Sequence, residues 1–343
     1  MAVHTLFKKK RRRALVVGYS AIGTGLIGFA LPLMPGFVLC IVGLSLLSFS
    51  SPKIRWLIAY AHAKHPRLAA PFAAIEKKLV DFFDLATHTL ELIHIPARNE
   101  HTLSAILEIS SVPRAPVAIL LHAGSATKES PVTTAITEAL RARGYTVLRF
   151  DAYDGLGESG GAYPSFTTSR YLEDLEDVVN WAREQSWWYG ELLLAGHSVG
   201  GTVGVHYATE HPEIVNHLVL FAPTLSGVIL ENAYSQCDPV MLEQWRVQGV
   251  RPVIHPLTGE THMQSLAFLE DLQQYDCMRA TSQLTMPVEV YCGTCDTITN
   301  SETCAQFALA IGQNARFVPI PELTHMPTGH HMLHMLTRTL VGK

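Results

Sequence analysis

The stretch LLLAGHSVGG, residues 192–201, constrains the fold of this 343-residue chain more than any other. Four apolar residues, the pattern Gly-x-Ser-x-Gly and a run of small residues predict a strand, a sharp turn and a buried helix, in that order. Ser198 stands at the tip of the turn, where a crowded backbone leaves no room for a Cβ atom two residues away on either side. Gly196 and Gly200 meet that requirement. We interpret Ser198 as a candidate nucleophile; an ordinary glycine-rich turn is the alternative.

A serine hydroxyl needs a base that takes its proton and a third group that holds the base. In a sheet of parallel strands, such groups belong on loops at the carboxyl ends of strands. Asp296 follows a predicted strand at 287–293, and His325 follows another at 316–321. Ser198, Asp296 and His325 therefore form a candidate catalytic triad of nucleophile, acid and base, and their order along the chain is one known for such triads.

Two alternatives accompany these assignments. Asp296 would otherwise cap its own loop as an Asx-turn. The base could instead be His330, His331 or His334, which lie at helical spacing near the end of the chain. His330 and His334 could also hold a metal, but no HExxH pattern or obvious carboxylate partner accompanies them, and we expect neither a metal nor a cofactor.

An oxyanion that forms on the substrate needs backbone N–H donors. Val199, directly after the candidate nucleophile, is expected to supply one from the first turn of a helix, where the helix dipole also favours negative charge. The second is expected from the loop after an apolar run at 116–121. We assign it to Gly124, with Ala123 as the alternative.

Strand-like and helix-like segments alternate from residue 88 onward, and this pattern predicts an α/β fold with a doubly wound, mostly parallel sheet. Two alternating segments, 89–97 and 102–110, are expected to form an antiparallel hairpin. The further expected strands are 116–121, 146–150, 191–195, 217–223, 287–293 and 316–321, and the expected helices include 131–143, 168–186 and 328–341.

Charge divides the chain into a basic N-terminal part and an acidic body. Residues 1–78 hold 12 Lys/Arg and a single acid, Glu76, whereas the remainder holds 14 Lys/Arg and 29 Asp/Glu. The negative body argues against a nucleic-acid partner. The six cysteines are irregularly spaced and are interpreted as mostly free thiols in a reducing compartment. Cys292 and Cys295 form the one suggestive pair, and packing at a strand end explains them better than a zinc site.

Residues 14–52 contain no Asp, Glu, Lys, Arg or His and follow six consecutive basic residues. Their length suits two short membrane spans, about 14–31 and 35–51, joined near Pro32 and Pro35. We expect a transmembrane helical hairpin in residues 1–53 with both ends in the cytoplasm, since basic residues flank both sides. A cleaved signal peptide and a buried soluble hairpin are weaker alternatives.

Residues 54–87 are predicted to form an amphipathic helix, either along an anionic membrane surface or as a linker packed on the body. The hydrolytic candidates all lie in a third segment, 88–343. The N-terminal runs LIGFALPLMPG and LLSFSSPKIRWL resemble those of small bacterial inner-membrane proteins of unknown function. That resemblance implies a membrane location and no chemistry.

Seven runs in the body carry a second resemblance: IHIPARNEHTLSAIL, AILLHAGS, LRFDAYDGLGESGG, YLEDLEDVVNWA, AGHSVGGTVG, FLEDLQQYDCMRATSQLTMPVEVYCGTCDTIT and FVPIPELTH. With them the body resembles the α/β-hydrolases, in a branch similar to cinnamoyl and feruloyl esterases. The resemblance implies the α/β-hydrolase fold, the roles assigned to Ser198, Asp296 and His325, and ester cleavage through an acyl-enzyme. It also implies a small lid insertion at about 224–285. The usual His-Gly pair after the third strand is His122-Ala123 here.

We therefore expect a membrane-anchored serine hydrolase that cleaves a carboxylic ester or thioester of a small-molecule or lipid-like acyl substrate. Its expected location is the cytoplasmic (inner) membrane, with the hydrolase domain facing the cytoplasm. Acyl transfer or peptidase-like use of the same triad is one alternative. A non-catalytic membrane scaffold with a vestigial triad is the other.

Overall fold

The computed structural model describes residues 89–342, together with Tyr19, Ser20, Ile22, Gly43, Leu44, Leu47 and Ile54. Apart from those few residues, the expected hairpin in 14–52 and the expected helix in 54–87 lie outside the described residues. Within the described part of the chain, no helix combines the length and apolar character needed to cross a membrane. The chain divides into two compact units, Met1–Leu92 and Ile93–Lys343.

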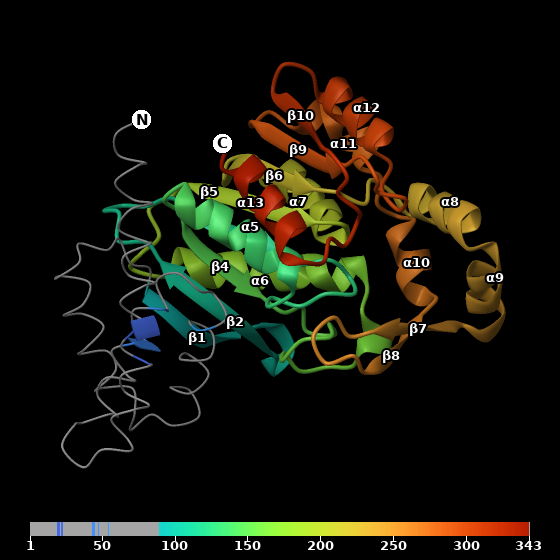
Figure 1. Ribbon diagram of the computed structural model, residues 1–343, viewed down its shortest axis with the longest axis horizontal. Helices are drawn as coiled ribbons and strands as arrows, with labels where there is room; N and C mark the ends of the chain where they lie inside the picture. Colours follow the sequence, from blue (N-terminus) through green and yellow to red (C-terminus); the bar gives the residue numbers. More distant parts are fainter. Residues whose placement is uncertain are drawn as a thin grey trace, which may run out of the picture. The chain divides into compact units, whose positions relative to one another are not determined.

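An eight-stranded sheet forms the centre of the hydrolase-like body (Figure 1). Its strands are β1 (Thr89–Pro96), β2 (Thr102–Ile109), β3 (Val117–Leu121), β4 (Thr146–Phe150), β5 (Leu192–His197), β6 (Val215–Phe221), β9 (Val288–Gly293) and β10 (Ala315–Ile320). They lie in the order β1-β2-β4-β3-β5-β6-β9-β10. β2 pairs antiparallel with β4, and every pair from β4 to β10 is parallel. The predicted α/β architecture with a mostly parallel sheet is confirmed.

Helices cover both faces of the sheet, which explains why β3 is apolar at every position. Side chains alternate along a strand, so Ala118 and Leu120 face one way and Ile119 and Leu121 the other. The first pair belongs to a core cluster with α5 (Pro131–Ala142) and α13 (His330–Leu340).

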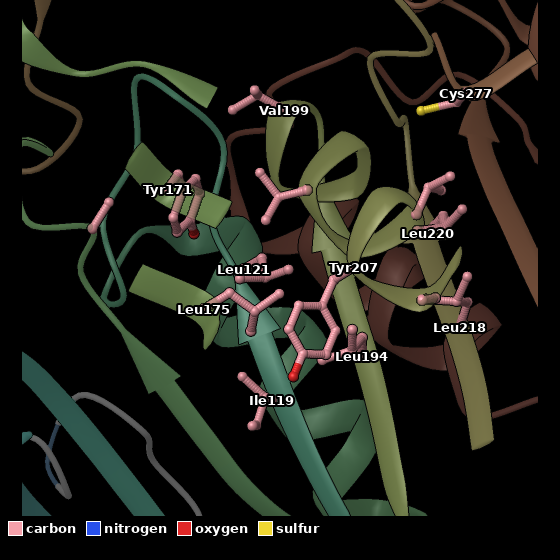
Figure 2. Close-up of a cluster of buried hydrophobic side chains, with 14 of the residues drawn as sticks. Ile119, Leu121, Tyr171, Leu175, Leu194, Val199, Tyr207, Leu218, Leu220 and Cys277 are labelled. Atoms are coloured by element: carbon pink, nitrogen blue, oxygen red, sulfur yellow. The ribbon is translucent and has the colours of Figure 1, made fainter. Parts of the chain in front are cut away.

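The opposite cluster contains Ile119 and Leu121 together with residues from several helices, among them α6 (Thr168–Arg183), α7 (Val199–Glu210) and α12 (Ser301–Ile311). Figure 2 shows Ile119 and Leu121 of β3 beside Leu175 of α6 and Tyr207 of α7. This packing fixes the start of α7, and with it the turn at Ser198, against the end of β3.

The insertion, residues 224–285, lies between β6 and β9 and appears at the right of Figure 1. It contains α8 (Gly227–Cys237), α9 (Pro239–Gln248), β7 (Val250–Ile254), β8 (Thr261–Ser265), α10 (Ala267–Leu272) and α11 (Cys277–Ala280). β7 and β8 form a separate antiparallel hairpin. The resemblance implies a small lid here, which stays a prediction.

Helix α12 was not among the expected elements. Its boundaries are nevertheless marked in the sequence: the Asn300 side chain accepts the N–H of Glu302 at the start, and Gly312, with φ 86°, ends the helix. Cys304 and Phe307 bury one face of it. The five described cysteines beyond residue 89 are all free thiols.

Candidate active site

Ser198 occupies a strained turn between β5 and α7, with φ 55° and ψ −122°. A Cβ atom on Gly196 would lie 2.4 Å from the carbonyl oxygen of Gly200, and one on Gly200 would lie 2.4 Å from that of Leu121. Only glycine fits at these positions, as the sequence motif predicts. The Ser198 N–H donates to the Phe221 carbonyl at 3.2 Å, so the turn is also tied to the end of β6.

The side chains of Ser198, His325 and Asp296 form a continuous hydrogen-bonded chain. Ser198 Oγ lies 2.9 Å from Nε2 of His325, and Nδ1 of His325 lies 2.9 Å from Oδ2 of Asp296. Asp296 follows β9 and His325 follows β10, so the loops at the carboxyl ends of two neighbouring strands meet at the elbow. The Asp296 side chain is fully buried, whereas 13% of the His325 side chain is exposed.

Asp296 uses its two carboxylate oxygens for different purposes. Oδ1 accepts the backbone N–H groups of Ile298 at 2.9 Å and Thr299 at 2.7 Å, while Oδ2 faces His325. The Asx-turn that the sequence offered as an alternative is therefore present together with the contact to histidine. The turn holds the carboxylate in place, and the carboxylate directs the Nδ1–H of His325.

His197, inside the Gly-x-Ser-x-Gly motif, makes a contact that sequence reasoning missed. Its Nε2–H donates to the backbone carbonyl of His325 at 3.0 Å, and the two rings lie 5.3 Å apart. Complete burial lowers the pKa of His197 well below its ordinary value, so the ring is neutral and carries its proton on Nε2. His197 thereby ties the loop of the candidate base to the strand before the candidate nucleophile.

Thr224 is a second missed residue. Its Oγ1 lies 3.1 Å from Ser198 Oγ, and its backbone N–H donates to the Ser198 carbonyl at 3.0 Å. Since the Ser198 hydroxyl must donate to Nε2 of His325 before proton transfer, the Thr224 hydroxyl donates to Ser198 Oγ. A polar residue directly after the predicted strand 217–223 was the available sequence signal.

The loop after β3 brings the candidate oxyanion donors together. A Cβ atom on Gly124 would lie 3.3 Å from Cγ1 of Val199, so Gly124 and the first residue of α7 are neighbours. In the same loop, the Ala123 carbonyl accepts from Nδ1 of His122 at 2.7 Å and from the N–H of Ala126 at 2.9 Å.

His122 keeps this loop in position in spite of the unusual His-Ala pair. Its Nε2 accepts the backbone N–H of Ala152 at 3.1 Å, which leaves the ring proton on Nδ1 for the Ala123 carbonyl. Complete burial lowers the pKa of His122, which keeps the ring neutral.

A buried ion pair supports the same loop. Lys128 Nζ lies 2.7 Å from Oδ2 of Asp151, and the two side chains are 1% and 0% exposed. Asp151 also accepts the backbone N–H of Lys128 at 2.7 Å and that of Glu158 at 2.8 Å. A Cβ atom on Gly157 would lie 1.9 Å from Cγ of Asp151, so the glycine-rich loop after β4 closes directly over this carboxylate.

Comparisons with known proteins agree with this geometry. Residues 114–256 match the signature of a family described as serine aminopeptidase, S33. The mitochondrial palmitoyl-protein thioesterase ABHD10 of Bos taurus is 24% identical over 175 residues, which are 51% of this chain and 55% of that protein. The chain thus spans about half the length of this relative.

Two further similarities differ in extent. A probable 1-acylglycerol-3-phosphate O-acyltransferase of Oryza sativa subsp. japonica is 35% identical over 80 residues, which are 22% of this chain and 19% of that protein. The structure of Est1E from Butyrivibrio proteoclasticus with ferulic acid bound superposes with a TM-score of 0.61 at 22% identity, covering 73% of this chain and 96% of that one. At this level of identity the superposition shows that the two proteins share a fold.

Proposed function

We propose that the chain is a serine hydrolase of the α/β-hydrolase superfamily and cleaves a carboxylic ester or thioester through an acyl-enzyme, which its fold and the family match over residues 114–256 support. The hydrogen-bonded chain from Ser198 through His325 to Asp296 carries this proposal. Ester and thioester bonds suit it, because a palmitoyl-protein thioesterase and a structure of Est1E with ferulic acid bound are among the similar proteins.

In the first half of the reaction, Ser198 Oγ attacks the substrate carbonyl carbon while Nε2 of His325 takes the hydroxyl proton. The carbonyl oxygen becomes an oxyanion, which the N–H groups of Val199 and Gly124 stabilise. The bond to the alcohol or thiol then breaks, and His325 returns the proton to that leaving group. Asp296 keeps Nδ1–H of His325 oriented and stabilises the imidazolium.

In the second half, a water molecule attacks the acyl carbon and gives a proton to Nε2 of His325. The bond to Ser198 Oγ breaks, the serine recovers its proton, and the free acid leaves. The Thr224 hydroxyl donates to Oγ in the resting enzyme, and that bond stabilises negative charge on Oγ.

A panel of p-nitrophenyl esters and matching thioesters of increasing acyl length tests the proposal on the full-length protein. We expect turnover that the substitution Ser198→Ala reduces to background, because it removes only the attacking oxygen. An unchanged rate in Ser198→Ala would contradict the proposal. A cellular phenotype shared by both proteins would instead indicate the non-catalytic scaffold.

Acyl transfer is a second candidate, favoured by the short match to an acyltransferase. The acyl-enzyme would then react with an alcohol in place of water. Product analysis in the presence of glycerol or a lysophospholipid separates the two: new ester indicates transfer, and free acid alone indicates hydrolysis.

Membrane anchoring through residues 14–52 is a separate proposal, supported by their lack of charge and by the basic residues on both sides. It predicts that the full-length protein stays with inner-membrane vesicles after alkaline carbonate washing. It also predicts that protease added on the cytoplasmic side digests the hydrolase domain. Recovery in the wash supernatant would contradict it.

A further inference from the structure

Arg251 in β7 differs from the other cations of the insertion. Residues 224–285 contain three arginines and no lysine, among seven acids. Arg246 pairs with Glu231 at 2.6 Å, and Arg279 pairs with Asp276 at 3.2 Å. Across the part of the chain that the structure describes, no carboxylate forms an ion pair with Arg251. A partly buried charge without a charged partner is costly, so the position of Arg251 calls for an explanation.

The contacts of Arg251 are all to neutral groups. Its Nε donates to Oε1 of Gln264 at 2.9 Å, and its Nη2 donates to the hydroxyl of Tyr234 at 3.1 Å. Its Nη1 contacts Sδ of Met241 at 3.8 Å. The guanidinium also lies over the ring of Trp245, 4.1 Å from the centroid. These contacts use three of five N–H donors and include no negatively charged group among the described residues.

Two more donors accompany the guanidinium. The Trp245 side chain is completely buried, and its Nε1–H has no hydrogen-bond partner among the described residues. The Tyr234 hydroxyl accepts from Arg251, so its own hydrogen is available to donate. A role as a structural link within the insertion would explain the neutral contacts of Arg251. It would not explain why a buried indole N–H in the same cluster lacks an acceptor.

A path of neighbouring residues links this donor cluster, Arg251 with Tyr234 and Trp245, to the oxyanion loop. Arg251 pairs across the hairpin with Gln264, and two residues before Gln264 the ring of His262 lies 6.3 Å from that of Tyr163. The Tyr163 hydroxyl in turn donates to the Gly124 carbonyl at 3.2 Å. Burial raises the pKa of Tyr163, and the nearby charge of Arg251 opposes that shift.

We propose that the donor cluster binds an anionic group of the substrate, a carboxylate or a phosphate, while the ester or thioester carbonyl lies at Ser198. Both anions are pure acceptors and match a planar guanidinium bidentately. The inference rests on the proposed hydrolase function and narrows its substrate to acyl compounds with a negative group. That group is either on the acyl chain or on the leaving alcohol or thiol.

Matched substrate pairs test both sources of the anion on the full-length protein. For the acyl side, p-nitrophenyl monoesters of succinic, adipic and suberic acid are compared with p-nitrophenyl esters of the monocarboxylic acids of equal length. For the leaving group, butyryl-coenzyme A is compared with the butyryl thioester of N-acetylcysteamine. We expect at least one anionic substrate to exceed its neutral partner about tenfold or more in kcat/KM.

Substitutions in the donor cluster should remove this preference selectively. Arg251→Gln should abolish it, mainly by raising KM, and leave the neutral partner within about twofold. Trp245→Phe keeps the stacked ring and removes only the N–H, so it should weaken the anionic substrate alone, as should Tyr234→Phe. Arg246→Gln, at a paired arginine on the same insertion, is the control and should change neither substrate.

Equal loss on both substrates in Arg251→Gln, or no anionic preference in the unsubstituted protein, would overturn the inference. Covalent labelling of Ser198 by an uncharged fluorophosphonate separates this failure from a failure of the proposed function. Labelling without anionic preference rejects only the donor cluster. Absence of labelling rejects the hydrolase itself. Unchanged labelling of Arg251→Gln shows that this variant keeps its fold.

Discussion

Nε2 of His197 lies 3.0 Å from the backbone carbonyl oxygen of His325, and this contact joins the strand before the candidate nucleophile to the loop of the candidate base. The strands of the sheet position both residues, because His197 is the last residue of β5 and His325 lies in the loop after β10. The distance between Ser198 Oγ and His325 Nε2 therefore depends on a residue that does not itself touch the substrate.

His197→Phe should lower activity by displacing His325. It keeps an aromatic ring in the buried site but leaves the His325 carbonyl without its donor, which costs about 1–3 kcal/mol. We expect kcat to fall by about tenfold or more with little change in KM. His197→Gln, whose amide N–H can reach the same carbonyl, is the control and should recover much of the loss. Equal kcat values for the two variants would contradict this positioning role.

Asp296→Asn should separate the two functions of that carboxylate. The remaining amide oxygen can still accept from Ile298 and Thr299, so the loop and the melting temperature should change little. The amide N–H₂ would face Nδ1 of His325 and favour the wrong tautomer, for which a loss of about four orders of magnitude in kcat is expected.

Asp296→Ala is the companion variant, because it also removes the Asx-turn. It should lower the melting temperature as well as kcat, which thermal denaturation with parallel kinetics measures. A large drop in the melting temperature of Asp296→Asn would show that the turn requires the charge.

Asp174 should make the protein less stable as pH rises toward neutrality. Burial raises its pKa to about 7, and the nearby Asp154 and Asp177 add to the effect, although the Tyr153 N–H opposes it. The folded state therefore favours the neutral acid. The contribution of Asp174 to the free energy of unfolding is complete at pH values below the pKa of the unfolded state, near 4. It is lost as pH rises through about 7, at about 1.4 kcal/mol per pH unit between these values.

Asp174→Asn remains neutral and can still accept the Tyr153 N–H. Denaturant unfolding should therefore show its stability rising relative to the unsubstituted protein between pH 4 and 7. If the difference in stability between the two proteins did not change with pH, Asp174 would be charged in the folded protein.

Glu289 should have the opposite pH dependence. Burial tends to raise its pKa, but hydrogen bonds from His217 and Tyr291 and the charge of Arg143 outweigh it and lower the pKa to about 2. The stabilisation from its charged form is present above the unfolded pKa near 4.5 and is lost as pH falls toward 2. The loss amounts to about 3 kcal/mol.

Glu289→Gln should therefore destabilise the protein at pH 7, and the difference from the unsubstituted protein should shrink as pH falls from 5 toward 2. Urea unfolding at a series of pH values measures this. A constant difference would show that packing, rather than charge, explains the effect.

The elements that sequence analysis placed best are those whose signal is local. Short apolar runs predicted β3 and β5, and the glycines of the elbow had to be glycine for steric reasons. Because parallel strands end at one edge of the sheet, the loops carrying Asp296 and His325 could be expected near Ser198 without knowledge of any contact.

The parts that sequence analysis missed depend on long-range contacts. His197 and Thr224 meet their partners across 128 and 26 residues, and no periodicity marks a residue for such a contact. The insertion is built from short elements whose apolar pattern is too brief to assign. Which arginines of the insertion form ion pairs can be seen only in the folded structure.

The role of Ser198 as nucleophile can be measured by mass spectrometry of the intact protein after reaction with a fluorophosphonate. We expect a single adduct that maps to Ser198, is absent in Ser198→Ala and forms far more slowly in His325→Gln. Absence of an adduct under conditions that label a control serine hydrolase, or an adduct on another residue, would contradict it.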